Sequence, residues 1–167
     1  MTNKLAPKPA KDSTVIMTEL VLPSDTNALG TIFGGKIMAW IDIAGAIAAG
    51  RHARQVVVTA SIDALHFIAP VKLGHVVHIR ASVNYAGRTS MEVGVRVDSE
   101  NPLNGEILHT ASAYATFVAL DSSGIPVTIP QLLAESPEEK RRLAQAVKRR
   151  EARIRLAEEL KKSHPDG

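Results

Sequence analysis

The chain has 167 residues, 45% of them hydrophobic and 22% charged, a composition typical of one globular domain with a substantial core. It contains no cysteine, which excludes disulfides and thiolate metal sites and favours an intracellular protein. The net charge of +3 comes from residues 135–167, where ten basic side chains accompany seven acidic ones and no aromatic ring. A charged tail of this kind predicts a solvated helix rather than a nucleic-acid surface.

The first third of the chain predicts a tail, a strand and a buried helix. Residues 1–13 are polar and contain prolines, so we expect a flexible tail rather than a signal peptide. Residues 14–22 are rich in β-formers and predict a strand. Residues 35–50 are apolar on nearly every side of a helix, and such a helix is normally enclosed by the rest of the fold. Gly45 costs this helix about 1 kcal/mol relative to alanine, which close packing could offset.

The middle of the chain is predicted to be almost entirely β-structure. Four segments have the composition of strands: residues 56–68, 76–84, 91–97 and 107–120. The second and third alternate apolar and polar residues around a turn near Gly87, as an antiparallel hairpin does. The last carries alanines on one face, which suits close contact with a helix. These features predict an α+β fold with an antiparallel sheet wrapped around one long helix.

The C-terminal segment predicts a second helix of a different character. Ser136-Pro137-Glu138-Glu139 matches a capping box with proline at the first helical position, and a charged helix should continue to about residue 162. Its apolar stripe is narrow, so we expect a surface or partner-facing helix.

No apolar run reaches the roughly 18 residues that a membrane span requires. The nearest candidate, the helix over residues 35–50, contains Asp42. We therefore expect no membrane insertion and a cytoplasmic location.

Asp42 is the most informative residue of that helix, because an unpaired buried carboxylate is very costly. One interpretation is an ion pair with a basic side chain such as Arg88 or His66. The other is a catalytic role as general base or nucleophile. The residue pattern alone leaves both open.

Gly34, Gly35 and Asn27, which all precede Asp42 in the sequence, can also be interpreted as ordinary structural residues. Gly34 and Gly35 could form a flexible turn, or could expose helix-start N–H groups that stabilise a developing oxyanion with help from the helix dipole. About two helical turns separate this pair from Asp42. Asn27, taken alone, is typical of a turn.

Three other functions suggested by sequence motifs are excluded by the residues present. The run from Gly30 to Lys36 has the spacing of a phosphate-binding loop, but Ile37 stands where serine or threonine must hold magnesium. His75 and His78 would lie on opposite faces of a strand and cannot share a metal. No G-x-S-x-G nucleophile elbow occurs, so a serine hydrolase lacks its main signature. We expect no metal site.

The stretch from Asn27 to Asp42, NALGTIFGGKIMAWID, resembles the signature of hotdog-fold acyl-CoA thioesterases, specifically the YciA/brain-type acyl-CoA hydrolase group. The similarity continues through residues 58–63, 67–71 and 87–91, and covers about residues 14–120. It implies a hotdog fold, with a five-stranded antiparallel sheet around a long central helix. The expected organisation is a flexible tail (1–13), a hotdog thioesterase domain (14–125), and a linker with a charged C-terminal helix (126–167).

This resemblance implies hydrolysis of acyl-CoA thioesters to a free acid and coenzyme A, without a metal or separate cofactor. By position, Asp42 matches the catalytic acid and Asn27 an asparagine that orients water or substrate. Gly34 and Gly35 match the amides that polarise the thioester carbonyl. The segment expected to line the coenzyme A site consists of Gly87, Arg88, Thr89 and Ser90.

The resemblance also implies an assembly. Active sites in this family lie at a homodimer interface, with Asn27 and Asp42 supplied by different protomers, and a trimer of dimers is expected. Two other activities occur on the same fold. A non-hydrolytic acyl-CoA-binding or regulatory domain is disfavoured by the presence of both Asn27 and Asp42. A hydroxyacyl-thioester dehydratase would use a histidine base, and none lies between Asn27 and Gly50.

Overall fold

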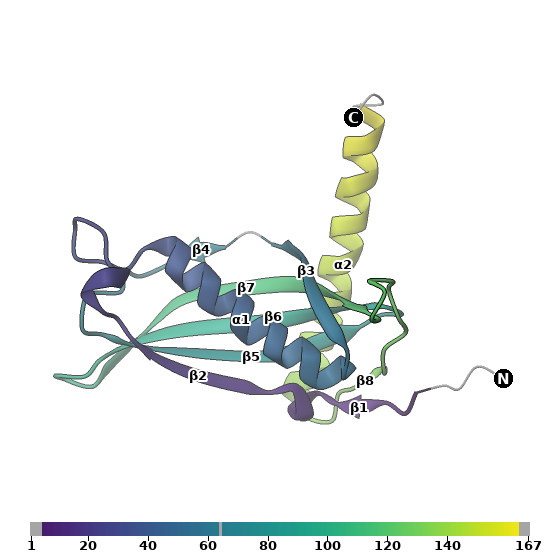
Figure 1. Ribbon diagram of the computed structural model, residues 1–167, viewed down its shortest axis with the longest axis horizontal. Helices are drawn as coiled ribbons and strands as arrows, with labels where there is room; N and C mark the ends of the chain where they lie inside the picture. Colours follow the sequence, from purple (N-terminus) through teal and green to yellow (C-terminus); the bar gives the residue numbers. More distant parts are fainter. Residues whose placement is uncertain (1–4, 64, 164–167) are drawn as a thin grey trace.

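The computed structural model describes residues 5–63 and 65–163 (Figure 1). Its strands are β1 (Lys8–Pro9), β2 (Val15–Leu20), β3 (Val56–Ile62), β4 (His66–Phe67), β5 (Val76–Ala86), β6 (Ser90–Asn101), β7 (Glu106–Leu120) and β8 (Leu132–Leu133). Its helices are α1 (Gly34–Ala53) and α2 (Pro137–Ser163), with short 3-10 turns η1 (Ala10–Ser13) and η2 (Pro23–Asp25).

Five strands form one antiparallel sheet in the order β2-β5-β6-β7-β3, and β4 adds a short pairing with β7. The sheet curls around α1, while the first half of α2 lies behind the opposite face (Figure 1). This arrangement confirms the predicted sheet wrapped around one long helix, with an extra helix at the C-terminus. The strand expected over residues 56–68 is divided, because β3 ends at Ile62 and the chain pairs again with β7 only at His66.

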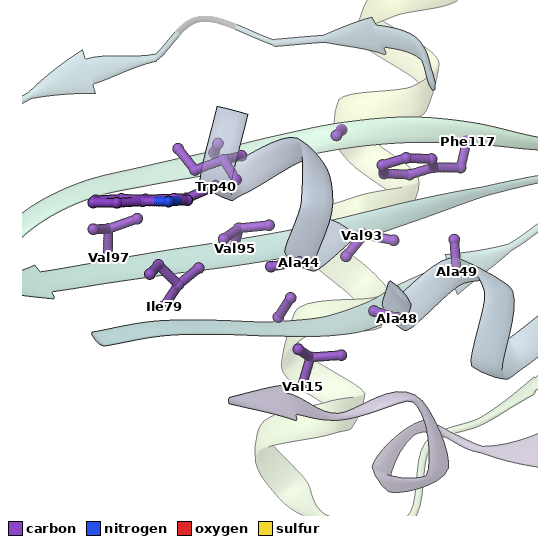
Figure 2. Packing of buried hydrophobic residues seen from close by; sticks show 14 of the residues in the cluster. Val15, Trp40, Ala44, Ala48, Ala49, Ile79, Val93, Val95, Val97 and Phe117 are labelled. Atoms are coloured by element: carbon purple, nitrogen blue, oxygen red, sulfur yellow. The ribbon is translucent and has the colours of Figure 1, made fainter. Parts of the chain in front are cut away.

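The core lies between α1 and the inner face of the sheet (Figure 2). The helix contributes residues such as Trp40, Ile41 and Ala44 to this core, and β5 and β6 contribute alternating valines and isoleucines. All of these side chains are nearly inaccessible to solvent. The alanines of β7 are fully buried, as their small size predicted. Gly45 permits the closest approach, because a Cβ at this position would lie 2.8 Å from the ring of Phe117. This contact is the close packing that was expected to offset the low helix propensity of Gly45.

The first half of α2 is attached to the outer face of the sheet mainly by arginines. Ala146 is fully buried there, and Arg149 stacks on Tyr114 with 3.6 Å between guanidinium carbon and ring centroid. Arg149 and Arg153 bind the carboxylate of Glu92, which is 1% exposed, at 2.7 and 3.1 Å. Breaking such a buried ion pair leaves an uncompensated charge, which typically costs about 3–5 kcal/mol. The predicted capping box is confirmed by the Ser136 hydroxyl accepting from Glu139 N–H and the Glu139 carboxylate accepting from Ser136 N–H.

The C-terminal end of α1 is fixed by segments from both ends of the chain. β1 and β8 pair in parallel, and the Lys8 ammonium donates to the His52 carbonyl at 2.8 Å. His52 is buried against the Pro130 carbonyl, and this burial lowers the pKa of its imidazole. Residues 8–13 belong to the segment expected to be a flexible tail, yet they form β1 and η1, and Ser13 is fully buried. Residues 1–4 lie outside the described part of the chain.

Within residues 5–63 and 65–163, neither helix combines the length and apolar character that crossing a bilayer would require.

The contact between Gly45 and Phe117 predicts the sign of a glycine substitution. Gly45→Ala should lower the free energy of unfolding by about 1–2 kcal/mol, because overpacking outweighs the gain in helix propensity. Urea unfolding at fixed protein concentration measures the change. Gly50→Ala is the matched control, since nothing lies within 4 Å of a Cβ there. It should raise stability by about 0.5–1 kcal/mol. Equal effects at the two positions would contradict this account of the helix packing.

Candidate active site

Gly34 and Gly35 are the first two residues of α1. Within the described residues, their N–H groups donate no hydrogen bond, as expected for the first turn of a helix. A Cβ on Gly34 would lie 3.2 Å from the Phe67 ring, whereas one on Gly35 would enter open space. Two unpaired donors and the positive end of the helix dipole are therefore available to an external oxygen at this position.

A cavity of about 320 Å³ lies directly beside the helix start. Its lining is largely apolar and consists of Thr31, Ile32, Gly34, Ile37, Phe67, Ile68, Ala69, Pro70 and Val71. This volume falls in the range of small-molecule sites, and the lining suits an aliphatic group.

The loop before the helix is braced by Asp25. Its carboxylate accepts from the Leu22 N–H at 3.0 Å and forms an ion pair with Lys36 at 3.1 Å. The Leu22 N–H and the Lys36 ammonium hold the pKa of Asp25 below its usual value. Lys36 also lies over the Trp40 ring. The lysine of the apparent phosphate-loop motif thus serves a structural role, consistent with rejecting that motif.

Asp42 lies partly exposed on the outward side of α1 and is bound by Thr59 of β3. The Thr59 hydroxyl donates to Asp42 Oδ1 at 2.6 Å. A β-bulge between Thr59 and Ser61 interrupts the pairing of β3 with β7 at this point, and bulges commonly redirect side chains next to active sites. Among the described residues, Asp42 forms no ion pair, so neither Arg88 nor His66 is its partner.

Thr59 was not identified as a site residue from the sequence. It lies in the segment 58–63, which contributed to the family resemblance without an assigned role. A polar residue in a valine-rich strand was the available signal, but a hydroxyl on an edge strand is too common to indicate a specific contact.

The Asn27 side chain forms its hydrogen bonds within its own turn. Its Oδ1 accepts from the N–H groups of Leu29 at 2.9 Å and Thr31 at 3.3 Å, and its Nδ2 donates to the Thr31 hydroxyl at 3.0 Å. In a single chain, the ordinary role of a turn residue accounts for all of these bonds.

One chain does not bring all the predicted site residues together. Asp42 is eight residues beyond Gly34, which corresponds to about 12 Å along the helix axis. The turn Gly87–Ser90 lies near the opposite end of the sheet from the helix start (Figure 1). There, Ile129 N–H donates to the Arg88 carbonyl and Gln131 to the Gly87 carbonyl, next to the end of α1.

An apolar surface surrounds Asp42. On α1, the side chains of Met38, Ile43 and Ile47 are 44%, 48% and 40% exposed. Val56 and Val58 of β3 are also exposed, and β3 is the edge strand of the five-strand order. Contiguous apolar surface beside an open strand edge is characteristic of a protein–protein interface.

Comparisons with known proteins all identify thioesterases as similar to this chain. Residues 29–106 match the family model described as the thioesterase superfamily. The acyl-CoA thioester hydrolase YkhA of Bacillus subtilis is 43% identical over 129 residues, which cover 77% of this chain and 75% of that protein. The crystal structure of an apo-hexameric acyl-CoA thioesterase is 46% identical, with a TM-score of 0.89, covering 92% of this chain and 98% of that one.

A third similar protein is the acyl-CoA hydrolase of Staphylococcus aureus, solved in complex with butyryl coenzyme A, coenzyme A and coenzyme A disulfide. It is 38% identical with a TM-score of 0.84, and the match covers 95% of this chain and 99% of that chain. Further structures of the same protein carry alanine in place of one asparagine, one aspartate or one threonine.

Proposed function

Because the chain belongs to the acyl-CoA thioester hydrolases of the thioesterase superfamily, we propose that Asp42 carries its reaction, at a site shared by two protomers. The observation that supports this role is the placement of Asp42. It is a carboxylate on an apolar surface, paired with no cation among the described residues and oriented by the Thr59 hydroxyl. A base or nucleophile needs a free oxygen, and the bond to Oδ1 leaves Oδ2 available.

The substituted forms of the Staphylococcus aureus enzyme support the same three residues here. The replaced asparagine and aspartate are 15 residues apart in that chain, and the threonine follows 17 residues later. Asn27, Asp42 and Thr59 have the same residue types at the same spacings. We therefore add Thr59 to the site as a positioning residue for Asp42.

The composite site follows from distance and symmetry. The helix-start amides lie about 12 Å along the axis of α1 from Asp42 of the same chain, and Asn27 belongs to the loop that leads into the helix start. If two copies pair through their β3 edges about a two-fold axis, each sheet is reversed relative to the other. The helix start and Asn27 of one protomer would then approach Asp42 and Thr59 of its partner. The same reversal moves the partner's Gly87–Ser90 turn toward this helix start.

In this arrangement, the N–H groups of Gly34 and Gly35 stabilise the oxyanion that develops on the thioester carbonyl. Asp42 either takes a proton from the attacking water or attacks the carbonyl itself. In the first route the water oxygen bonds to the carbonyl carbon, and in the second an acyl–Asp42 anhydride forms that water then hydrolyses. In both routes the C–S bond breaks, the sulfur leaves with the electron pair and is protonated as coenzyme A, and the acyl group is released as a carboxylic acid. Asn27 orients the water or the carbonyl. No step needs a metal or a separate cofactor.

The surrounding surfaces suggest how the substrate lies. The apolar cavity beside Gly34 suits the acyl part, and the turn formed by Gly87, Arg88, Thr89 and Ser90 would line the coenzyme A part, with the exposed Arg88 available to a phosphate. The hexameric relative supports a trimer of dimers, and we propose that the enzyme works in the cytoplasm.

Removing the Asp42 carboxylate tests the proposed chemistry. Asp42→Asn should lower kcat for a short acyl-CoA by at least about a hundredfold, because the amide can neither accept the proton nor attack. Thiol release measures the rate, and circular dichroism with urea unfolding checks the fold. Turnover close to wild type in a folded Asp42→Asn protein would exclude Asp42 as the catalytic group.

The Thr59 hydroxyl should affect catalysis through Asp42. Thr59→Val is expected to reduce kcat about tenfold with little change in KM, since one hydrogen bond to a charged group is lost. Thr59→Ser should restore most of the rate, because it keeps the hydroxyl. If valine and serine behave alike, the hydroxyl has no positioning role and only packing at the bulge matters.

Mixing two variants of lowered activity tests whether the site is shared. Asn27→Ala and Asp42→Ala chains, unfolded together and refolded at equal amounts, should recover about a quarter of wild-type activity. Half of the random dimers are then mixed, and each mixed dimer retains one intact site. Refolding each variant alone provides the control. Activity no higher than the average of those controls would place both residues in the same protomer's site.

A further inference from the structure

The turn Gly87–Ser90, where β5 passes into β6, is held by a segment from much later in the chain. The Gln131 side chain donates to the Gly87 carbonyl at 3.2 Å, and the Ile129 N–H donates to the Arg88 carbonyl at 2.9 Å. Within residues 5–63 and 65–163, the Arg88 N–H donates no hydrogen bond, and Arg88 is exposed. The turn is therefore fixed through its carbonyls, while the donors of Arg88 remain accessible to a ligand.

Pro130, between these two donors, binds the end of α1 instead. Its carbonyl lies 2.8 Å from Nε2 of His52, and both residues are buried. A carbonyl can only accept a hydrogen bond, so Nε2 carries the ring proton. The other ring nitrogen, Nδ1, is buried without a partner among the described residues. Burial lowers the pKa of this imidazole, so the ring is neutral near pH 7 and holds Pro130 through a single N–H.

Lys8 joins both sides of this contact. Its backbone N–H donates to the Gln131 carbonyl at 2.9 Å, and its ammonium donates to the His52 carbonyl at 2.8 Å. Residues 129–131 form what we call the bracing segment. This segment is bound to the end of α1 through His52 and Lys8, and to the turn Gly87–Ser90 through Ile129 and Gln131.

We propose that His52 is a positioning residue for the coenzyme A end of the substrate, acting through the bracing segment on the turn Gly87–Ser90. The inference rests on the proposed function, which assigns this turn to coenzyme A. A surface loop held only at its strand ends is mobile, and a ligand that must order it loses part of its binding free energy. The bracing segment removes that cost for the donors of Arg88.

The same geometry separates binding from chemistry. In the proposed site, the reacting carbonyl is held by the amides of Gly34 and Gly35, which lie at the other end of α1 from His52. Loosening the turn should therefore weaken binding of the coenzyme A part and leave the chemical step unchanged. A loss of uniform binding of this kind raises KM without lowering kcat.

Steady-state kinetics with two thioesters test the proposal. Butyryl coenzyme A carries both parts of the substrate, whereas S-butyryl-N-acetylcysteamine has the same thioester but ends before the phosphates. His52→Leu removes the N–H donor and should raise KM for butyryl coenzyme A about tenfold, with kcat changed by less than about twofold. For the truncated thioester, kcat/KM should stay at the wild-type value.

Three further variants make the result specific. His52→Gln can place an N–H donor near the position of Nε2, so it should recover most of the affinity for butyryl coenzyme A. Gln131→Ala removes an exposed donor without disturbing the core, and should raise the same KM about threefold. Thr128→Ala is the matched control, because Thr128 is exposed next to the bracing segment and its side chain forms no hydrogen bond with the described residues.

An unchanged KM for butyryl coenzyme A in Gln131→Ala, or in folded His52→Leu, would overturn the proposal. So would an equal loss of kcat/KM with both thioesters, which would place the effect at the reacting carbonyl or in the fold. Equal values for the leucine and glutamine variants would show that packing, not the N–H, matters. In all three cases wild-type hydrolysis of butyryl coenzyme A remains, and so does the proposed function. Equal wild-type kcat/KM for the two thioesters would instead refute the coenzyme A role of the turn, and the role of His52 with it.

Discussion

The close packing of α1 against β7 is the constraint on which the rest of the structure depends. Phe117 occupies the space that a side chain at Gly45 would need, and the β7 alanines bring the sheet close to the helix. This contact fixes the rotation of α1 about its axis. Once Ile37, Ile41 and Ala44 face the sheet, Met38, Asp42 and Ile43 must face outward. A helix free to rotate could not keep one carboxylate on an otherwise apolar surface.

The sheet separates two regions with different chemistry. Its inner face packs on the helix through apolar side chains, and beyond that helix lies the surface that carries Asp42. Its outer face is polar, with ion pairs between Asp98, Glu92 and arginines, and is partly covered by α2. The alternation of side chains along β5 and β6 produces both faces from the same residues in sequence. The same strands therefore pack against α1 through one face and form the ion-paired surface of the sheet with the other.

Much of the fold was predictable because its signals are local. The apolar helix, the alternation in β5 and β6, the alanines of β7 and the capping box at Ser136 each follow from a few neighbouring residues, and the structure agrees with them. Contacts between distant segments were not predictable in the same way. Thr59 reaches Asp42 only because a bulge interrupts the pairing of β3. Residues 8–13 looked like a tail because their order comes from distant segments. Lys8 and Pro9 pair with Leu132 and Leu133, and the Ser13 hydroxyl accepts from the Val83 N–H.

The open edge of β3 has a consequence for the life of a newly made chain. In the proposed assembly, a subunit that has not yet met a second copy exposes the unpaired backbone of β3 beside Met38, Ile43, Val56 and Val58. An open strand edge of this kind is a template for pairing with other extended chains, because backbone hydrogen bonding discriminates poorly between partners. Slow synthesis or strong dilution lengthens the time spent in this state. Formation of the proposed dimer would therefore also remove a surface prone to aggregation.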